Sequence, residues 1–68
     1  MAKFNNITVD ISDWRALNGR AIRDRVTKEM WSKGAPEEDM EAYCAAVDGK
    51  ASQETIDVTK GWVRLKFN

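Results

Sequence analysis

Hydrophobic and polar residues alternate with a period of two near each end of the chain and with a helical period between the ends. In residues 4–11, Ile7, Val9 and Ile11 fall on one side of an extended chain, and polar residues fall on the other. This alternation is typical of a strand that buries one face. The same pattern returns in residues 62–67, where the residues expected to point inward are Val63, Leu65 and Phe67. We therefore predict one strand near each end of the chain.

A long helical pattern extends from Asp13 to Lys33 and contains six of the eleven basic residues. Within it, Ile22, Val26 and Met30 recur at every fourth position and so form one apolar stripe. The stripe predicts a main helix that ends near Lys33 and packs against the strands.

The start of this segment does not share the stripe. Trp14 and Leu17 are spaced as on a helix, but they point in a different direction from the later apolar residues. Asn18 and Gly19 lie at the change of phase, and both residue types are common at helix ends. We expect a short helical turn over residues 13–17, a break at Asn18-Gly19 and then the main helix. One continuous, curved helix is the alternative.

A second helical pattern follows Gly34. Pro36 suits the first position of a helix, and the carboxylates in the next turn complement the helix dipole. Apolar residues then recur at helical spacing, and they are Met40, Tyr43, Cys44 and Val47. Asp48 and Gly49 end the pattern, so we predict a helix between Pro36 and Asp48.

The segment Ser52–Lys60 has two interpretations. Its β-branched residues favour a strand, and they are Thr55, Ile56, Val58 and Thr59. Such a strand would turn at Gly61 and pair with residues 62–67 as a hairpin. The alternative is a short capped helix that is stopped by Gly61. We prefer the strand because of the β-branched residues.

The predicted fold class is α+β, with the element order β-α-α-β-β. We expect residues 1–68 to form a single domain in which two helices pack on one face of a three-stranded antiparallel sheet. The predicted core residues are Ile7, Val9, Ile11, Leu17, Ile22, Val26, Met30, Met40, Tyr43, Cys44, Val47, Ile56, Val58, Val63, Leu65 and Phe67.

The net charge is zero, but the charges are segregated along the chain. Residues 12–34 contain six basic and three acidic side chains, whereas residues 35–57 contain one basic and seven acidic side chains. Residues 58–68 contain three basic side chains and no acidic one. Blocks of opposite sign predict a polarised surface, which steers binding more than it determines the fold.

The sequence offers little chemistry for catalysis. It contains no histidine, which removes the commonest general base and metal ligand. Cys44 lies on the apolar stripe of the second helix, where a thiol is usually an inert small hydrophobic group. The four glycines form no phosphate-binding motif. We therefore expect no catalytic residues, no metal site and no cofactor.

Cysteine usage and hydropathy indicate a compartment. A single cysteine excludes an intramolecular disulfide and suits a reducing cytoplasm. No apolar run approaches the ~20 residues that cross a bilayer, and no signal-peptide pattern opens the chain. We expect a cytoplasmic protein that does not bind membranes.

The favoured function is binding to another protein. Tryptophan and arginine are frequent among the residues that dominate protein interfaces. The predicted interface consists of Arg20, Lys28, Trp31, Trp62, Arg64 and Lys66. A predicted acidic patch, which in one version of the hypothesis imitates DNA phosphates, consists of Glu37, Glu38, Asp39 and Glu41.

Two of these interface residues have competing interpretations. Trp31 either packs under the connection at residues 34–36 or stays exposed beside Arg20 and Lys28. Trp62 either joins the interface or lies flat over the edge of the sheet. The size of the chain suggests a phage or mobile-element accessory factor that binds and modulates a host protein, for example as an inhibitor. The small core also suggests self-association into a homodimer.

A nucleic-acid-binding protein is the alternative function. A strand, two helices and a terminal hairpin occur in this order in winged helix-turn-helix domains. The residues that would contact phosphates are Arg15, Arg20, Arg23, Arg25 and Lys28, with Lys60, Arg64 and Lys66 on the hairpin. The zero net charge and the acidic start of the second helix count against this function.

Overall fold

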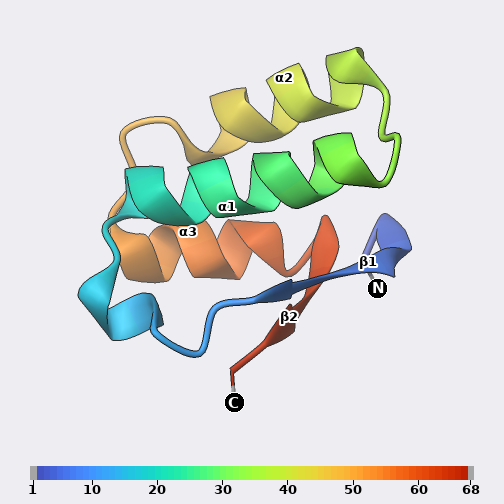
Figure 1. Cartoon of the computed structure of the whole chain (residues 1–68). Coiled ribbons are helices and arrows are strands. Elements are labelled where there is room, and N and C mark those ends of the chain that lie inside the picture. The colour runs from blue at the N-terminus through green and yellow to red at the C-terminus, as the bar shows by residue number, and fades with distance from the viewer. Residues whose placement is uncertain (1, 68) are drawn as a thin grey trace.

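Two strands and three α-helices make up the computed structural model of this chain, which describes residues 2–67 (Figure 1). In chain order they are β1 (Phe4–Asp10), a 3₁₀ turn (Trp14–Ala16), α1 (Gly19–Ser32), α2 (Glu37–Val47), α3 (Ser52–Thr59) and β2 (Val63–Lys66). The strands pair in parallel as a two-stranded sheet. The helices lie together on one side of that sheet, with α1 and α3 nearest to it in Figure 1. The chain is thus a small α+β domain.

The prediction of a three-stranded antiparallel sheet is wrong, because the segment Ser52–Lys60 does not form a strand. Residues 52–59 form the helix α3 instead. The buried residues of α3 are Thr55, Ile56 and Thr59. Ile56 follows Thr55 directly and Thr59 lies four positions after Thr55, so all three fall on one face of a helix. The alternative of a short helix before Gly61 is therefore the correct one.

Hydrogen bonds explain why the threonines of α3 are stable in a helix. The Thr55 hydroxyl donates to the carbonyl of Ala51 at 2.9 Å, and the Thr59 hydroxyl donates to the carbonyl of Thr55. These bonds satisfy two hydroxyl groups that are fully buried. At the start of α3, the Ala51 N–H donates to the Glu54 carboxylate at 3.4 Å. Glu54 at the third helical position is thus a sequence signal for a helix start.

The third helix also explains why the two strands are parallel. Each connection reverses the direction of the chain, as Figure 1 shows for α1, α2 and α3. With three helices between the strands, the chain enters β2 in the same direction as β1. A hairpin after two helices, as predicted, would have made neighbouring strands antiparallel.

The predicted break in the first helical segment is present. A 3₁₀ turn covers Trp14–Ala16, and α1 begins at Gly19. Asn18 caps α1, because its side-chain oxygen accepts a hydrogen bond from the Ala21 N–H at 2.8 Å. The residues that α1 buries are those of the predicted stripe, Ile22, Val26 and Met30.

The second predicted helix corresponds to α2. Its first helical residue is Glu37, so Pro36 occupies the capping position rather than the first helical position. Gly34 and Gly49 lie in the connections before and after α2, with φ angles of 79° and 71°. Glycine adopts this left-handed conformation without steric cost, which makes both residues suitable for ending a helix.

The core contains most of the predicted residues. The buried hydrophobic residues are Ile7, Val9, Ile11, Ile22, Val26, Met30, Tyr43, Val47, Ile56 and Val63, and all belong to the predicted core. Five other predicted core residues are only partly buried and pack against this core, namely Leu17, Met40, Cys44, Val58 and Leu65. The prediction for Phe67 is wrong, because β2 ends at Lys66 and the Phe67 side chain is 42% exposed.

Tyr43 provides a test of how α2 and α3 are joined. It is fully buried, and its hydroxyl lies 2.7 Å from the Thr59 hydroxyl. Because the Thr59 hydroxyl already donates to the carbonyl of Thr55, Tyr43 is the donor to Thr59. Tyr43→Phe removes this bond, and we expect it to lower the free energy of unfolding at pH 7 by about 1 kcal/mol. Urea denaturation measures the change.

The same comparison has a pH dependence. Burial raises the pKa of Tyr43 to about 12, from 10.0 for an exposed tyrosine. Above pH 10 the unfolded chain loses this proton while the folded chain keeps it, so the stability of the wild type falls as the pH rises toward 12. Tyr43→Phe lacks this titration, so the wild type should lose its advantage of about 1 kcal/mol above pH 10. It should become the less stable protein as the pH nears 12, because each pH unit in this range costs up to about 1.4 kcal/mol. Equal slopes of stability against pH in the two proteins would contradict the assignment.

Candidate functional site

Strand β2 has a neighbour on one side only, which is β1. The carbonyl groups of Trp62 and Lys66 accept hydrogen bonds of 2.7 and 2.8 Å from backbone N–H groups at the two ends of β1. The main-chain groups of successive strand residues point to opposite sides of the strand. The N–H and C=O groups of Val63 and Leu65 therefore point away from β1, toward an edge that no strand covers within residues 2–67.

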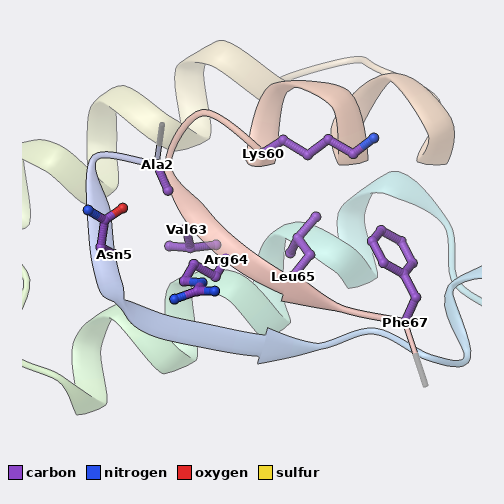
Figure 2. Close-up of a pocket in the computed structure, with 7 residues that line it drawn as sticks. All are labelled: Ala2, Asn5, Lys60, Val63, Arg64, Leu65 and Phe67. Carbon is purple, nitrogen blue, oxygen red and sulfur yellow. The ribbon is translucent and has the colours of Figure 1, made fainter.

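A groove of about 480 Å³ lies along β2 (Figure 2). In this view Ala2 and Asn5 lie near one end of β2 and Phe67 lies near the other. Lys60 extends from the end of α3 on the side of β2 that is opposite to β1. We call this hollow the β2 groove, and its lining residues are Ala2, Asn5, Lys60, Val63, Arg64, Leu65 and Phe67.

The two faces of β2 differ in polarity. Val63 is buried and Leu65 is half-buried, whereas Arg64 and Lys66 are exposed. Since successive side chains of a strand point to opposite faces, the apolar pair faces the helices and the basic pair faces solvent. Phe67 follows the strand and presents an exposed aromatic ring at the end of the groove.

The β2 groove carries positive charge. Lys60 and Arg64 line it, and its described lining contains no acidic residue. The Lys60 ammonium lies 3.8 Å from the Asp57 carboxylate, but these side chains are 59% and 66% exposed. An ion pair between such exposed groups is weak. The groove therefore combines apolar surface with basic side chains.

The other edge of the sheet is partly closed by side chains. Arg25 on α1 donates to the main-chain carbonyl of Asp10 at 3.3 Å and to the Asp13 carboxylate at 2.6 Å. The Ser12 N–H donates to the Asp10 carboxylate at 3.0 Å. The bond from Ser12 lowers the pKa of Asp10, and the bond from Arg25 lowers the pKa of Asp13. The carbonyl group at the end of β1 is thus capped by a side chain on the outer edge of that strand.

The residues of the predicted interface divide between two elements. Arg20, Lys28 and Trp31 lie on α1, and Arg64 and Lys66 lie on β2. Trp31 is 73% exposed, so it does not pack under the connection between α1 and α2.

Trp62 lies just before β2 and is half-buried. Its ring meets Tyr43 edge to face, with ring centroids 5.8 Å apart and planes at 72°. The Lys3 ammonium lies 5.3 Å from the centre of the Trp62 ring and donates to the Asp39 carboxylate at 2.7 Å. Asp39 of the predicted acidic patch is therefore paired, and the exposed members of that patch are Glu37, Glu38 and Glu41.

Several basic residues that were candidates for phosphate contacts have other partners. Arg23 pairs with Asp24 at 3.0 Å, and the Arg15 guanidinium lies 5.3 Å from the centre of the Trp14 ring. Arg25 is held by Asp13. The terminal hairpin that would serve as a wing is also missing from the described chain, because the partner of β2 is β1.

The rest of the described surface offers less. A second hollow of about 400 Å³ lies where α1 begins, and it is lined by Arg20, Arg23 and Lys50 but also by Asp48. Within residues 2–67, no three His, Cys, Asp or Glu side chains are grouped so that they could hold a metal ion. No helix in that range has both the length and the apolar character needed to cross a bilayer. The β2 groove is the feature that unites a hollow, an exposed aromatic ring and free main-chain groups.

Sequence reasoning identified two basic residues of this region but not the groove. Arg64 and Lys66 belong to the predicted interface, whereas Leu65 and Phe67 belong to the predicted core. The predicted hairpin would have covered this edge of β2. The signal that reveals the edge is Glu54, because a helix starting there leaves β2 without a hairpin partner.

Comparisons with protein-family models, with curated proteins and with solved structures found no match to this chain.

Proposed function

We propose that this protein is a small, non-enzymatic interaction module that binds another protein through the β2 groove. The observation that carries the proposal is the open edge of β2 beside the exposed ring of Phe67. An open strand edge binds an extended segment of a partner through main-chain hydrogen bonds, and adjacent hollows take the side chains of that segment. The β2 groove has both features.

The position of the exposed aromatic residues supports this choice of surface. Trp31 and Phe67 are the exposed large hydrophobic residues of the described chain. Phe67 lines a groove next to free main-chain groups, whereas Trp31 lies on α1. Aromatic side chains that can enter or line a hollow are typical anchors of protein interfaces.

Nucleic-acid binding has less support. The winged-helix comparison depends on a terminal hairpin, and the described chain has a parallel strand pair instead. Arg23 and Arg25 form ion pairs with acidic neighbours, which reduces the positive charge that α1 presents to phosphates.

The proposed module acts in the cytoplasm on a protein that it modulates by occupying an edge or loop of that protein. The single cysteine, Cys44, is free and suits a reducing compartment. Small accessory factors of phages and mobile elements that bind host proteins are the functional class that we propose.

The proposal is tested by selecting binders from a random-peptide display library on the immobilised full chain. We expect Phe67→Ala to lower the affinity for the selected peptides by about tenfold or more. The fold should be retained, because Phe67 is exposed. Trp31→Ala is measured in parallel by the same titration. Loss of binding with Trp31→Ala but not with Phe67→Ala would contradict the β2 groove as the binding surface.

A further inference from the structure

We infer that the β2 groove binds an extended peptide segment in which acidic and apolar side chains alternate, and that this segment joins the sheet as a third strand beside β2. The inference rests on the proposed function and adds the chemistry of the partner. It follows from three properties of β2, which are its free main-chain groups, its two unlike faces and its charge.

The main chain of β2 specifies an extended partner. Lys66 uses its carbonyl group to pair with β1, and the alternation of main-chain groups leaves those of Val63 and Leu65 on the open side. A partner strand at the usual spacing of about 4.8 Å satisfies these groups. A helix cannot do so, because its own N–H and C=O groups are bonded within the helix.

The side chains of β2 specify the alternation. Neighbouring side chains on one face of a sheet contact each other across the strands. On the face toward the helices, the neighbours of the partner strand are Leu65 and Phe67, which favour apolar residues. On the solvent face, the neighbours are Arg64 and Lys66, which favour carboxylates. A segment with acidic and apolar residues at alternate positions matches both faces.

The same charges argue against a second copy of this chain as the occupant. Pairing β2 with β2 of another copy would place Arg64 and Lys66 beside the same basic residues, and like charges on neighbouring strands are destabilising. Short edge strands with basic side chains are a common protection against self-pairing. The partner is therefore a different protein with an acidic segment.

The peptides selected on the full chain test the partner chemistry directly. Peptides that lose binding with Phe67→Ala are groove-dependent, and we expect them to alternate acidic and apolar residues. Groove-dependent peptides that are neutral or basic would overturn this inference while leaving the proposed function in place. A selection without groove-dependent peptides would overturn both.

A charge-reversed variant tests the solvent face of β2. We expect Arg64→Glu combined with Lys66→Glu to lower the affinity for the acidic peptides by about tenfold or more. The matched control, Lys33→Glu combined with Lys50→Glu, changes the net charge equally at exposed positions outside β2 and its groove. This control variant should bind the peptides with an affinity within about twofold of the wild type, once salt screens the long-range effect of the changed net charge. Equal losses in the two variants would show that the peptides respond to net charge and would overturn the inference.

A main-chain change tests strand addition itself. Chemical synthesis of the full chain with an N-methyl group on Leu65 removes an outward N–H donor but keeps every side chain. The control is an N-methyl group on Ser52, the first residue of α3, whose N–H has no acceptor within the helix. We expect the modification at Leu65 to abolish peptide binding and the modification at Ser52 to preserve it, with the fold checked by circular dichroism. Retained binding with N-methyl-Leu65, or a homodimer in light scattering that this modification converts to a monomer, would overturn the inference.

Discussion

Replacing Met30 by alanine is expected to lower the free energy of unfolding by about 2–5 kcal/mol. Met30 is fully buried in α1 and continues the stripe of Ile22 and Val26. A domain of 68 residues typically has a total stability of about 3–10 kcal/mol. Met30→Ala therefore removes a large part of the stability, because it leaves a cavity among side chains that cannot fully close around it. Urea denaturation followed by circular dichroism measures the change.

The neighbouring residue provides the control for this experiment. Trp31 is 73% exposed although it adjoins Met30 in the chain. Trp31→Ala should change the free energy of unfolding by no more than about 0.5 kcal/mol. Comparable losses of stability in the two variants would show that Trp31 is packed. They would contradict the orientation of α1, in which Met30 faces the core and Trp31 faces solvent.

Replacing Gly19 by alanine is expected to destabilise the fold by about 1–3 kcal/mol, although alanine is the better helix former. A Cβ atom at Gly19 would collide with the carbonyl oxygen of Lys50 and would lie 2.8 Å from the Thr55 hydroxyl oxygen. The Lys50 oxygen belongs to the main chain, so it cannot rotate away as the end of a side chain can. The start of α1 and the connection before α3 would have to separate.

Gly61 provides the matched glycine for comparison. Apart from the adjoining residues, the nearest atom to a Cβ atom there is the Val58 carbonyl oxygen at 3.5 Å, and Gly61 does not adopt a positive φ. Gly61→Ala should therefore be neutral or stabilise the chain by up to about 1 kcal/mol. In a domain of this size each kcal/mol shifts the melting temperature by roughly 4–8 °C. If Gly19→Ala melts at or above the temperature of Gly61→Ala, the close approach between α1 and Lys50 is incorrect.

The elements that sequence reasoning identified correctly are those in which the apolar period has one interpretation. Ile22, Val26 and Met30 match a helix and no strand, and the alternation in residues 4–11 matches a strand and no helix. The break at Asn18 was also predictable, because the apolar direction changes there and the side chain can cap a helix.

The segment that was predicted wrongly, Ser52–Lys60, has a pattern with two interpretations. Its β-branched residues favour a strand, but Thr55, Ile56 and Thr59 also lie on one face of a helix. Tertiary contacts favour the helix, because the Thr59 hydroxyl accepts a hydrogen bond from the buried Tyr43. The strand propensity of neighbouring residues does not reflect this contact, because it joins residues that are far apart in the chain.

The candidate site was predictable only in part for the same reason. The alternation of β2 predicts that Arg64 and Lys66 are exposed, and both are. That β2 has an open edge depends on α3 being a helix and on β1 pairing with β2 from the other end of the chain. Exposure of Phe67 follows from where β2 ends.

The sequence by itself determined the strand at each end, the phase of α1 and α2, and the buried hydrophobic residues of the described chain, because these depend on the spacing of neighbouring side chains. Only the tertiary structure decided the identity of α3, the parallel direction of the strands and the open edge of β2. These depend on which distant groups meet, as Tyr43 meets Thr59 and as the start of α1 meets Lys50. Gly19 shows the difference, since its sequence position indicates a helix end while its need for glycine comes from a main-chain oxygen across the fold.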